Sequence, residues 1–169
     1  MKKKNIFVFI LIAIAAVLYI IANKGLSNLA NEADTQMLAQ QIQQLDPQLR
    51  FNANAYLLKH SAPPQNPNPF MQEGMFPQLS LTCDKQANMC SDQRFLYTGK
   101  CNAETCLLNI VYAEEASPQY VATHGLDFMI TLQAYPQEKR VCFYNSKLGR
   151  QVCKYLEEQG WPIRQLLAE

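Results

Sequence analysis

One stretch near the N-terminus constrains this chain more than any other. Residues 6–22 form an uncharged apolar run in which only Tyr19 carries a polar atom, and three lysines precede it. As a helix rising about 1.5 Å per residue, the uncharged segment 5–23 would span roughly 28 Å, close to the ~30 Å hydrocarbon core of a bilayer. The pattern predicts one membrane-spanning helix. Because the lysines cluster before it, we expect the N-terminus in the cytoplasm, an inner-membrane location, and a head in the periplasm or at the cell surface.

The competing interpretation is a cleaved signal peptide, whose apolar region is usually about 7–15 residues long and ends in a small-x-small site. The run here is longer, and residues 21–24 offer no good cleavage site, so a retained helix in contact with membrane lipid is favoured. The side chains expected to form the anchor are Ile6, Phe9, Leu11, Ile14, Leu18 and Ile21.

The remaining length leaves room for one domain of ordinary size. We expect an α+β fold in which a long N-terminal membrane-anchored helix is followed by a small antiparallel sheet head with disulfide-closed loops. The expected segments are 1–24, leader and transmembrane helix; 25–60, amphipathic helical extension; 61–78, proline-rich loop; and 79–169, the head with a short C-terminal helix.

Charge argues against a nucleic-acid partner. Four of the fifteen basic residues lie at or before Lys24, which leaves eleven against fourteen acidic residues, a balance of −3 for the exported part. No basic face of the kind that binds nucleic acid is therefore expected there.

Six cysteines indicate disulfides, because the count is even and the chain is expected to reach an oxidising compartment. Six cysteines allow fifteen pairings, so the sequence leaves the connectivity open, although proximity favours three short loops. Buried reduced thiols are the alternative. The spacings and the presence of only two histidines do not favour zinc, and no metal site is predicted. The favoured pairs are Cys83–Cys90, Cys101–Cys106 and Cys142–Cys153.

After the anchor, apolar residues continue at helical spacing and predict an amphipathic helix. Asp46-Pro47 is expected to interrupt it, since proline disfavours helical geometry in the residue before it, and a second helical piece is expected to about Lys59. The apolar stripe could pack against the protein's own domain or against neighbouring subunits. The side chains predicted to pack are Leu26, Ala30, Ala33, Met37, Ile42 and Leu45.

The proline-rich loop carries Phe70, Met71, Met75 and Phe76, which would either pin it to the head or form an exposed patch. Beyond it, alternation and turn residues predict strands. The expected elements are short strands near 80–82 and 95–97, a turn at 98–100, a buried strand at 105–112, a connection bounded by Pro118 and Gly125, an antiparallel pair at 126–135 and 140–144, a helix at 151–159 and a last helical turn at 163–169.

This order of elements resembles that of type IV pilins and of the pseudopilins of type II secretion systems. The most specific similarity is the segment 140–156, a strand, a cysteine, a turn with Asn145 and Gly149, and a helix that starts at a valine-cysteine-lysine sequence. The resemblance implies a structural, membrane-anchored minor pilin or pseudopilin, with other pilin-like subunits as partners through the N-terminal helix.

The chain departs from that family at two positions. Asn5 stands where the family has glycine before the peptidase cut, and the fifth residue after such a cut would be Ile10 instead of glutamate. Without the glutamate, which in the family pairs with a neighbour's N-terminal amine, a major fibre subunit is not expected. The sequence leaves open whether a leader peptidase cuts the chain.

Catalysis is not predicted. His60 and His124 fall in expected loops, and adjacent carboxylates such as Glu114-Glu115 and Glu157-Glu158 point in different directions on a helix or strand. No redox, phosphate-binding or calcium-binding motif occurs, so neither an enzyme nor a small-molecule cofactor is expected. The alternative function is a single-pass anchor that carries an extracytoplasmic ligand- or protein-binding module outside any fibre. The many tyrosines would serve such a site, or line the core.

Overall fold

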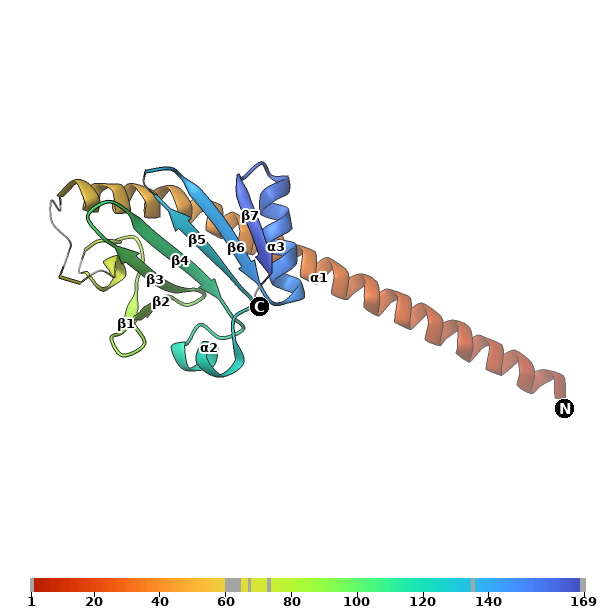
Figure 1. The fold of residues 1–169 in the computed structure, drawn as a ribbon. Coiled ribbons are helices and arrows are strands. Elements are labelled where there is room, and N and C mark those ends of the chain that lie inside the picture. The colour runs from red at the N-terminus through yellow and green to blue at the C-terminus, as the bar shows by residue number, and fades with distance from the viewer. Residues whose placement is uncertain (1, 60–64, 67, 73, 135, 168–169) are drawn as a thin grey trace.

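The computed structural model describes residues 2–59, 65–66, 68–72, 74–134 and 136–167, and for residues 2–13, 26, 28, 30, 166 and 167 it describes the backbone alone. A long first helix is followed by a sheet with two further helices (Figure 1). The elements are α1 (Lys2–Lys59), η1 (Pro69–Met71), β1 (Thr82–Asp84), β2 (Met89–Ser91), β3 (Leu96–Cys101), β4 (Cys106–Tyr112), α2 (Pro118–His124), β5 (Phe128–Gln133), β6 (Lys139–Tyr144), α3 (Lys147–Glu158) and β7 (Ile163–Leu167).

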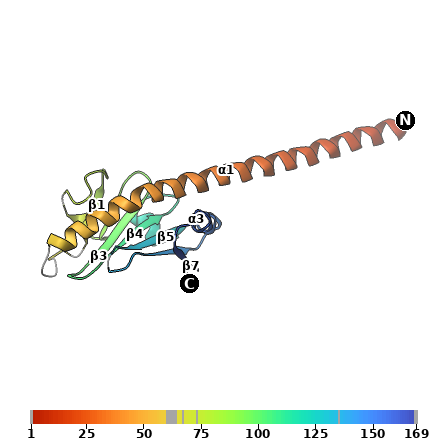
Figure 2. The same ribbon diagram turned by 90° about the horizontal axis from the view of Figure 1, so that it is seen from above.

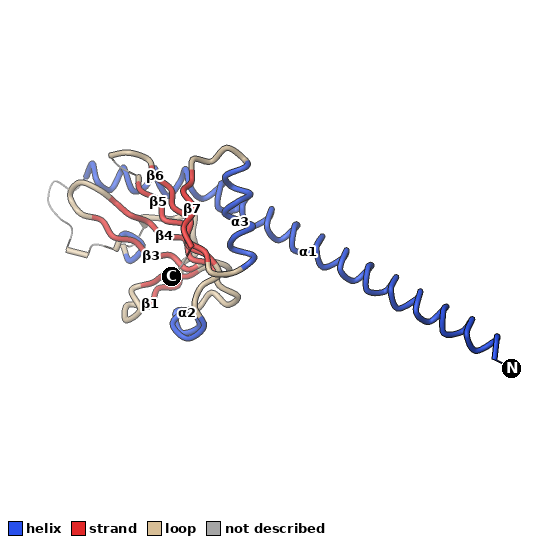
Figure 3. Tube along the Cα trace, turned by 45° about the vertical axis from the view of Figure 1, so that its right-hand side comes forward, coloured by secondary structure: helices blue, strands red, loops and turns tan. Residues whose placement is uncertain are grey.

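The seven strands pair in chain order, from β1 to β7. All neighbours are antiparallel except β6 and β7, which run parallel because α3 carries the chain back between them. The C-terminal half of α1 crosses the sheet, and the N-terminal half continues beyond the head (Figures 1 and 2). Figure 3 shows α2 apart from α1, at another end of the sheet.

The structure corrects the predicted fold class. The fold is α+β, but among the described residues no helix combines the length and the apolar character needed to cross a membrane. The predicted membrane-anchored helix is therefore wrong for this fold. The sheet is also larger than the predicted small antiparallel head, with seven strands and one parallel pair.

The prediction that α1 breaks at Pro47 is wrong, because the helix is continuous through this residue. Proline removes one backbone hydrogen bond from a helix. On either side of it, however, Ile42, Asp46 and Leu49 are buried against the head. Tertiary packing of both flanks outweighs the local cost.

Two predictions near the C-terminus also fail. The segment expected as a last helical turn is β7, in which Ile163 pairs with Arg140 of β6, and the helix expected from residue 151 begins earlier, at Lys147. Ser146 caps α3 by accepting the backbone N–H of Gly149 at 3.0 Å. A Cβ atom on Gly149 would lie 2.3 Å from the backbone oxygen of Asp127, so glycine here permits close packing of α3 on the sheet.

Two further predictions differ from the structure, and in both a glycine or proline was expected to mark a turn or loop. Residues 98–100, predicted as a turn, lie inside β3. Glycine at position 99 permits the close approach of Pro69, because a Cβ atom there would lie 3.1 Å from the Pro69 ring. The connection between Pro118 and Gly125 contains α2, which begins with Pro118 after a Ser117 cap.

The core lies between the sheet and the docked part of α1 with α3. The predicted alternation in β5 is confirmed, because Phe128, Ile130 and Leu132 are buried and the residues between them are half-buried. The proline-rich loop is pinned, since Phe70 and Phe76 are buried and stack at 4.4 Å between ring centroids. Other fully buried side chains include Leu38, Leu49, Tyr97, Leu108, Ile110, Val152 and Leu156.

Three disulfides close local loops, as the spacing of the cysteines favoured. Cys83–Cys90 joins β1 to β2, and Cys101–Cys106 staples the β3–β4 turn. Cys142–Cys153 ties β6 to α3. Each bond stabilises the fold by restricting the unfolded chain.

Candidate functional site

The candidate site is the protruding half of α1, where the helix leaves the head (Figure 2). Every side chain that the structure describes between residues 14 and 34 is exposed. Burial begins at Thr35, which is 6% exposed and whose hydroxyl donates to the backbone oxygen of Asn31 at 2.8 Å. The helix therefore divides into a protruding half and a docked half at this residue.

Seven large apolar side chains are exposed in the described part of the protruding half, six of them between Ile14 and Ile21. Their exposed fractions run from 51% to 70%. Monomeric soluble proteins rarely expose contiguous apolar surface of this kind, and such surfaces mark sites of interaction. The residues are Ile14, Val17, Leu18, Tyr19, Ile20, Ile21 and Leu29.

The predicted anchor residues fall on this half of α1. Ile14, Leu18 and Ile21 are exposed, whereas the side chains of Ile6, Phe9 and Leu11 lie outside the described part of the chain. The structure shows no contact of the described three with the head.

The predicted packing stripe divides between the two halves. Ile42 is buried and Leu45 packs partly buried against the core, but Ala33 and Met37 are exposed. The structure describes only the backbone of Leu26 and Ala30. The buried face of the docked half instead consists of Leu38, Ala39, Ile42, Leu49, Ala53 and Tyr56.

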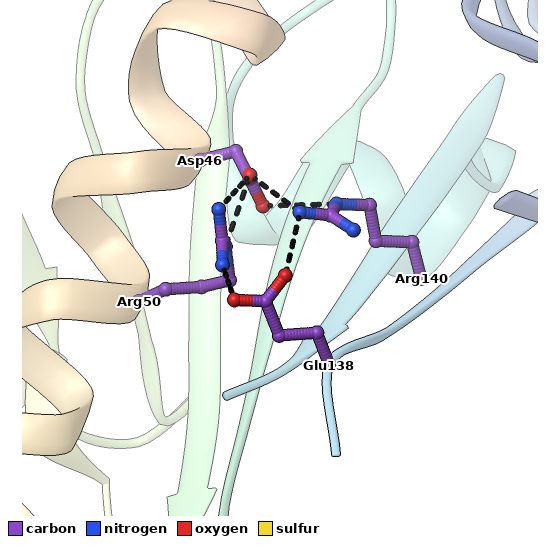
Figure 4. A network of polar contacts seen from close by, with 4 residues as sticks. All are labelled: Asp46, Arg50, Glu138 and Arg140. Atoms are coloured by element: carbon purple, nitrogen blue, oxygen red, sulfur yellow. Dashed lines mark hydrogen bonds and ion pairs between the residues drawn. The ribbon is translucent and has the colours of Figure 1, made fainter. Parts of the chain in front are cut away.

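A network of four charged residues fixes the docked half to the head (Figure 4). Asp46 on α1 is 2% exposed and accepts hydrogen bonds from Arg50 and from Arg140 of β6, each with an N–O distance of 3.0 Å. Glu138 in the β5–β6 turn contacts both arginines, Arg140 at 3.5 Å. Arg140 also lies over the Trp161 ring, 5.0 Å from its centroid. The network pairs two carboxylates with two guanidinium groups.

Sequence reasoning missed this network. From the sequence, Asp46 is interpreted only as part of a helix boundary and Arg140 only as the first residue of a predicted strand, and Arg50 and Glu138 have no assigned role. A local signal was present, because Asp46 and Arg50 are four residues apart and would share a helix face. The contact between α1 and β6 joins residues 94 apart in the chain, which no local pattern contains.

A second polar cluster surrounds Asp92, in the turn between β2 and β3. Its carboxylate accepts the backbone N–H groups of Arg94 and Phe95, both at 2.7 Å, and the Tyr97 hydroxyl at 2.6 Å. Burial raises the pKa of the Tyr97 phenol well above its ordinary value, and the hydrogen bond to Asp92 raises it further. Tyr97 is therefore a neutral hydrogen-bond donor inside the head.

The histidines and paired carboxylates do not form a catalytic arrangement in the described part. His124 stacks on Tyr120 at 4.4 Å, and the Tyr120 hydroxyl donates to Glu114 at 3.0 Å. That hydrogen bond is the main cause of the raised pKa of Tyr120. His60 lies outside the described residues, and Glu158 pairs with Lys154 at 3.5 Å.

Within the described ranges, no group of three or more histidine, cysteine or acidic side chains could hold a metal ion. Comparison of the chain with protein-family models, with curated proteins and with solved structures finds no match. The resemblance to pilins and pseudopilins therefore depends on the sequence segment 140–156 and on the order of the elements.

Proposed function

We propose that this chain is a structural subunit of a pilin-like assembly, such as a minor pilin or pseudopilin. In this assembly the protruding half of α1 packs against the corresponding helices of neighbouring subunits, and the head is displayed on the outside. The observation that carries the proposal is the exposed apolar surface between Ile14 and Leu29.

The rest of the molecule supports this role. A subunit that packs through one helix needs that helix held firmly on its head, and the buried Asp46–Arg140 pair holds it. Three disulfides support a head exported to an oxidising compartment. Burying the exposed side chains in a helix bundle would gain about 25 cal/mol for each Å² of apolar area removed from water.

Photo-crosslinking in cells that express the full chain tests the proposal. A photoreactive amino acid would replace Leu18 or Leu29, which are 61% and 65% exposed. The matched control is Leu107, also apolar and exposed (40%) but placed on β4 of the head. We expect covalent dimers and larger species from the two α1 positions and monomers from the control.

Monomers at all three positions would overturn the proposal and favour the alternative, a binding module that acts outside an assembly. Equal crosslinking at Leu107 and Leu18 would also contradict it, because contact would then not be specific to the protruding half.

A further inference from the structure

A cavity of about 540 Å³ opens beside the docked half of α1. Its wall carries one guanidinium group, one carboxylate (Asp92), one hydroxyl (Ser80) and four carboxamides. Gln41 and Gln44 come from α1, Gln78 and Gln93 come from the loops before β1 and β3, and Arg94 follows Gln93. The volume falls within the range of roughly 300–1,000 Å³ that is typical of small-molecule sites.

Arg94 supplies positive charge to this cavity. Its Nη1 atom lies 3.2 Å from the Gln41 side-chain oxygen and 3.1 Å from the Met37 sulfur. No carboxylate among the described residues forms an ion pair with it. The nearby Asp92 carboxylate already accepts two backbone N–H groups and the Tyr97 hydroxyl. The guanidinium, with five donors in a planar fork, is therefore available to a bound carboxylate.

The carboxamides suit hydroxyl groups. Each glutamine side chain carries two N–H donors and one carbonyl acceptor. The Gln41 oxygen already accepts from Arg94, but together the four carboxamides can pair with hydroxyls that both donate and accept. Leu45 and Leu79, which also line the cavity, supply apolar contact for the C–H face of a sugar ring.

The extent of the site favours a compact solute over a peptide. The lining residues on α1 run from Gln41 to Leu45, about one helical turn, or ~6 Å at 1.5 Å per residue. An extended peptide advances about 3.3 Å per residue, so only two of its residues would lie along this wall.

We propose that this cavity binds a small hydroxylated carboxylate of the hexuronic acid class, with its carboxylate on Arg94 and its hydroxyls on the surrounding glutamines. This binding is independent of assembly through α1 and adds a recognition site to the head.

Isothermal titration of the full chain in detergent with galacturonic acid tests this site. Galactose, which has the same ring but lacks the carboxylate, is the neutral comparison. We expect saturable binding of galacturonic acid and binding of galactose weaker by about tenfold or more, the effect of losing a hydrogen bond to a charged group. No saturation up to about 10 mM, or equal affinity for the two sugars, would overturn the proposal.

Variants separate the site from general charge effects. Arg94→Gln should weaken galacturonic acid binding about tenfold or more, while Gln44→Ala should weaken both sugars. Lys85→Gln, a control at an exposed position of the β1–β2 turn, should change neither affinity. Unchanged binding by a folded Arg94→Gln protein, checked by circular dichroism, would refute the assignment. Glutamate binding as tightly as galacturonic acid would also refute it, because the hydroxyls would then contribute nothing.

Discussion

Replacing Asp46 by asparagine tests whether the buried charge network holds α1 on the head. The substitution keeps the size of the side chain and removes its charge. It leaves Arg140, whose side chain is 6% exposed, with Glu138 at 3.5 Å as the opposite charge nearest to it in the network. Glu138 is 55% exposed and compensates the guanidinium only in part.

Removing one partner of a buried ion pair typically costs about 3–5 kcal/mol, because the other charge remains out of water. Glu138 and the Trp161 ring still contact Arg140 after the substitution. We therefore expect Asp46→Asn to lower the free energy of unfolding by about 3 kcal/mol, the lower end of that range. For a chain of this size the melting temperature should fall by about 10 °C.

Urea unfolding followed by tryptophan fluorescence measures the effect at the site itself, since Trp161 is the only tryptophan in the sequence and lies over Arg140. The matched control is Lys154→Gln, which breaks a pair whose side chains are 68% and 59% exposed. An exposed pair of this type contributes about 0.5 kcal/mol or less.

A double-mutant cycle completes the test. Asp46→Asn combined with Arg140→Gln should cost less than the sum of the single substitutions by about 1 kcal/mol or more, because the two side chains are in contact. A loss below about 1 kcal/mol for Asp46→Asn, or additive effects in the cycle, would refute the conclusion that this network fixes α1.

Three further predictions concern the head and the helix. Gly149→Ala should destabilise the fold by about 1–3 kcal/mol in urea unfolding, because the added Cβ has no space. Gly25→Ala is the control: a Cβ there meets nothing within 4 Å, so the substitution should stabilise α1 by about 0.5–1 kcal/mol. Equal effects of the two substitutions would contradict the packing argument. Replacing Cys142 and Cys153 by serine should cost about 3 kcal/mol in the same assay, and an unchanged midpoint would show that the bond adds nothing. Because burial raises the pKa of Tyr97 in the folded state, its contribution to stability is complete below the unfolded pKa of about 10 and is lost as pH rises above it. The free energy of unfolding should therefore decrease less above about pH 10 in Tyr97→Phe than in the unaltered chain. The measurement is the free energy of unfolding determined at each alkaline pH, with brief exposure to that pH.

Local patterns in the chain were enough to predict several features. Periodic apolar residues indicated the helical extension, strict alternation indicated β5, and short spacing between cysteines favoured the three bonds that the structure contains. Each of these signals lies within about fifteen residues, over which side-chain direction follows directly from backbone geometry.

The candidate site was predictable only in part. The apolar run, predicted to cross a membrane, lies in the half of α1 that protrudes from the head, and the sequence did not indicate where α1 docks. The packing stripe included Ala33 and Met37, which are exposed, and omitted Leu38 and Ala39, which are buried. Neighbouring positions on a helix differ by about 100°, so a small error in the assumed face exchanges a buried residue for an exposed one.

The amino-acid sequence therefore carries the helix periods, the strand alternation and the cysteine loops, because these depend on neighbours along the chain. The continuity of α1 through Pro47, the parallel pairing of β7, and the Asp46–Arg140 contact arise only when distant segments pack. In each case the free energy of burial or charge pairing outweighs a local preference or has no local counterpart. Those same long-range contacts hold the docked half of α1 on the sheet and leave its apolar half outside the head.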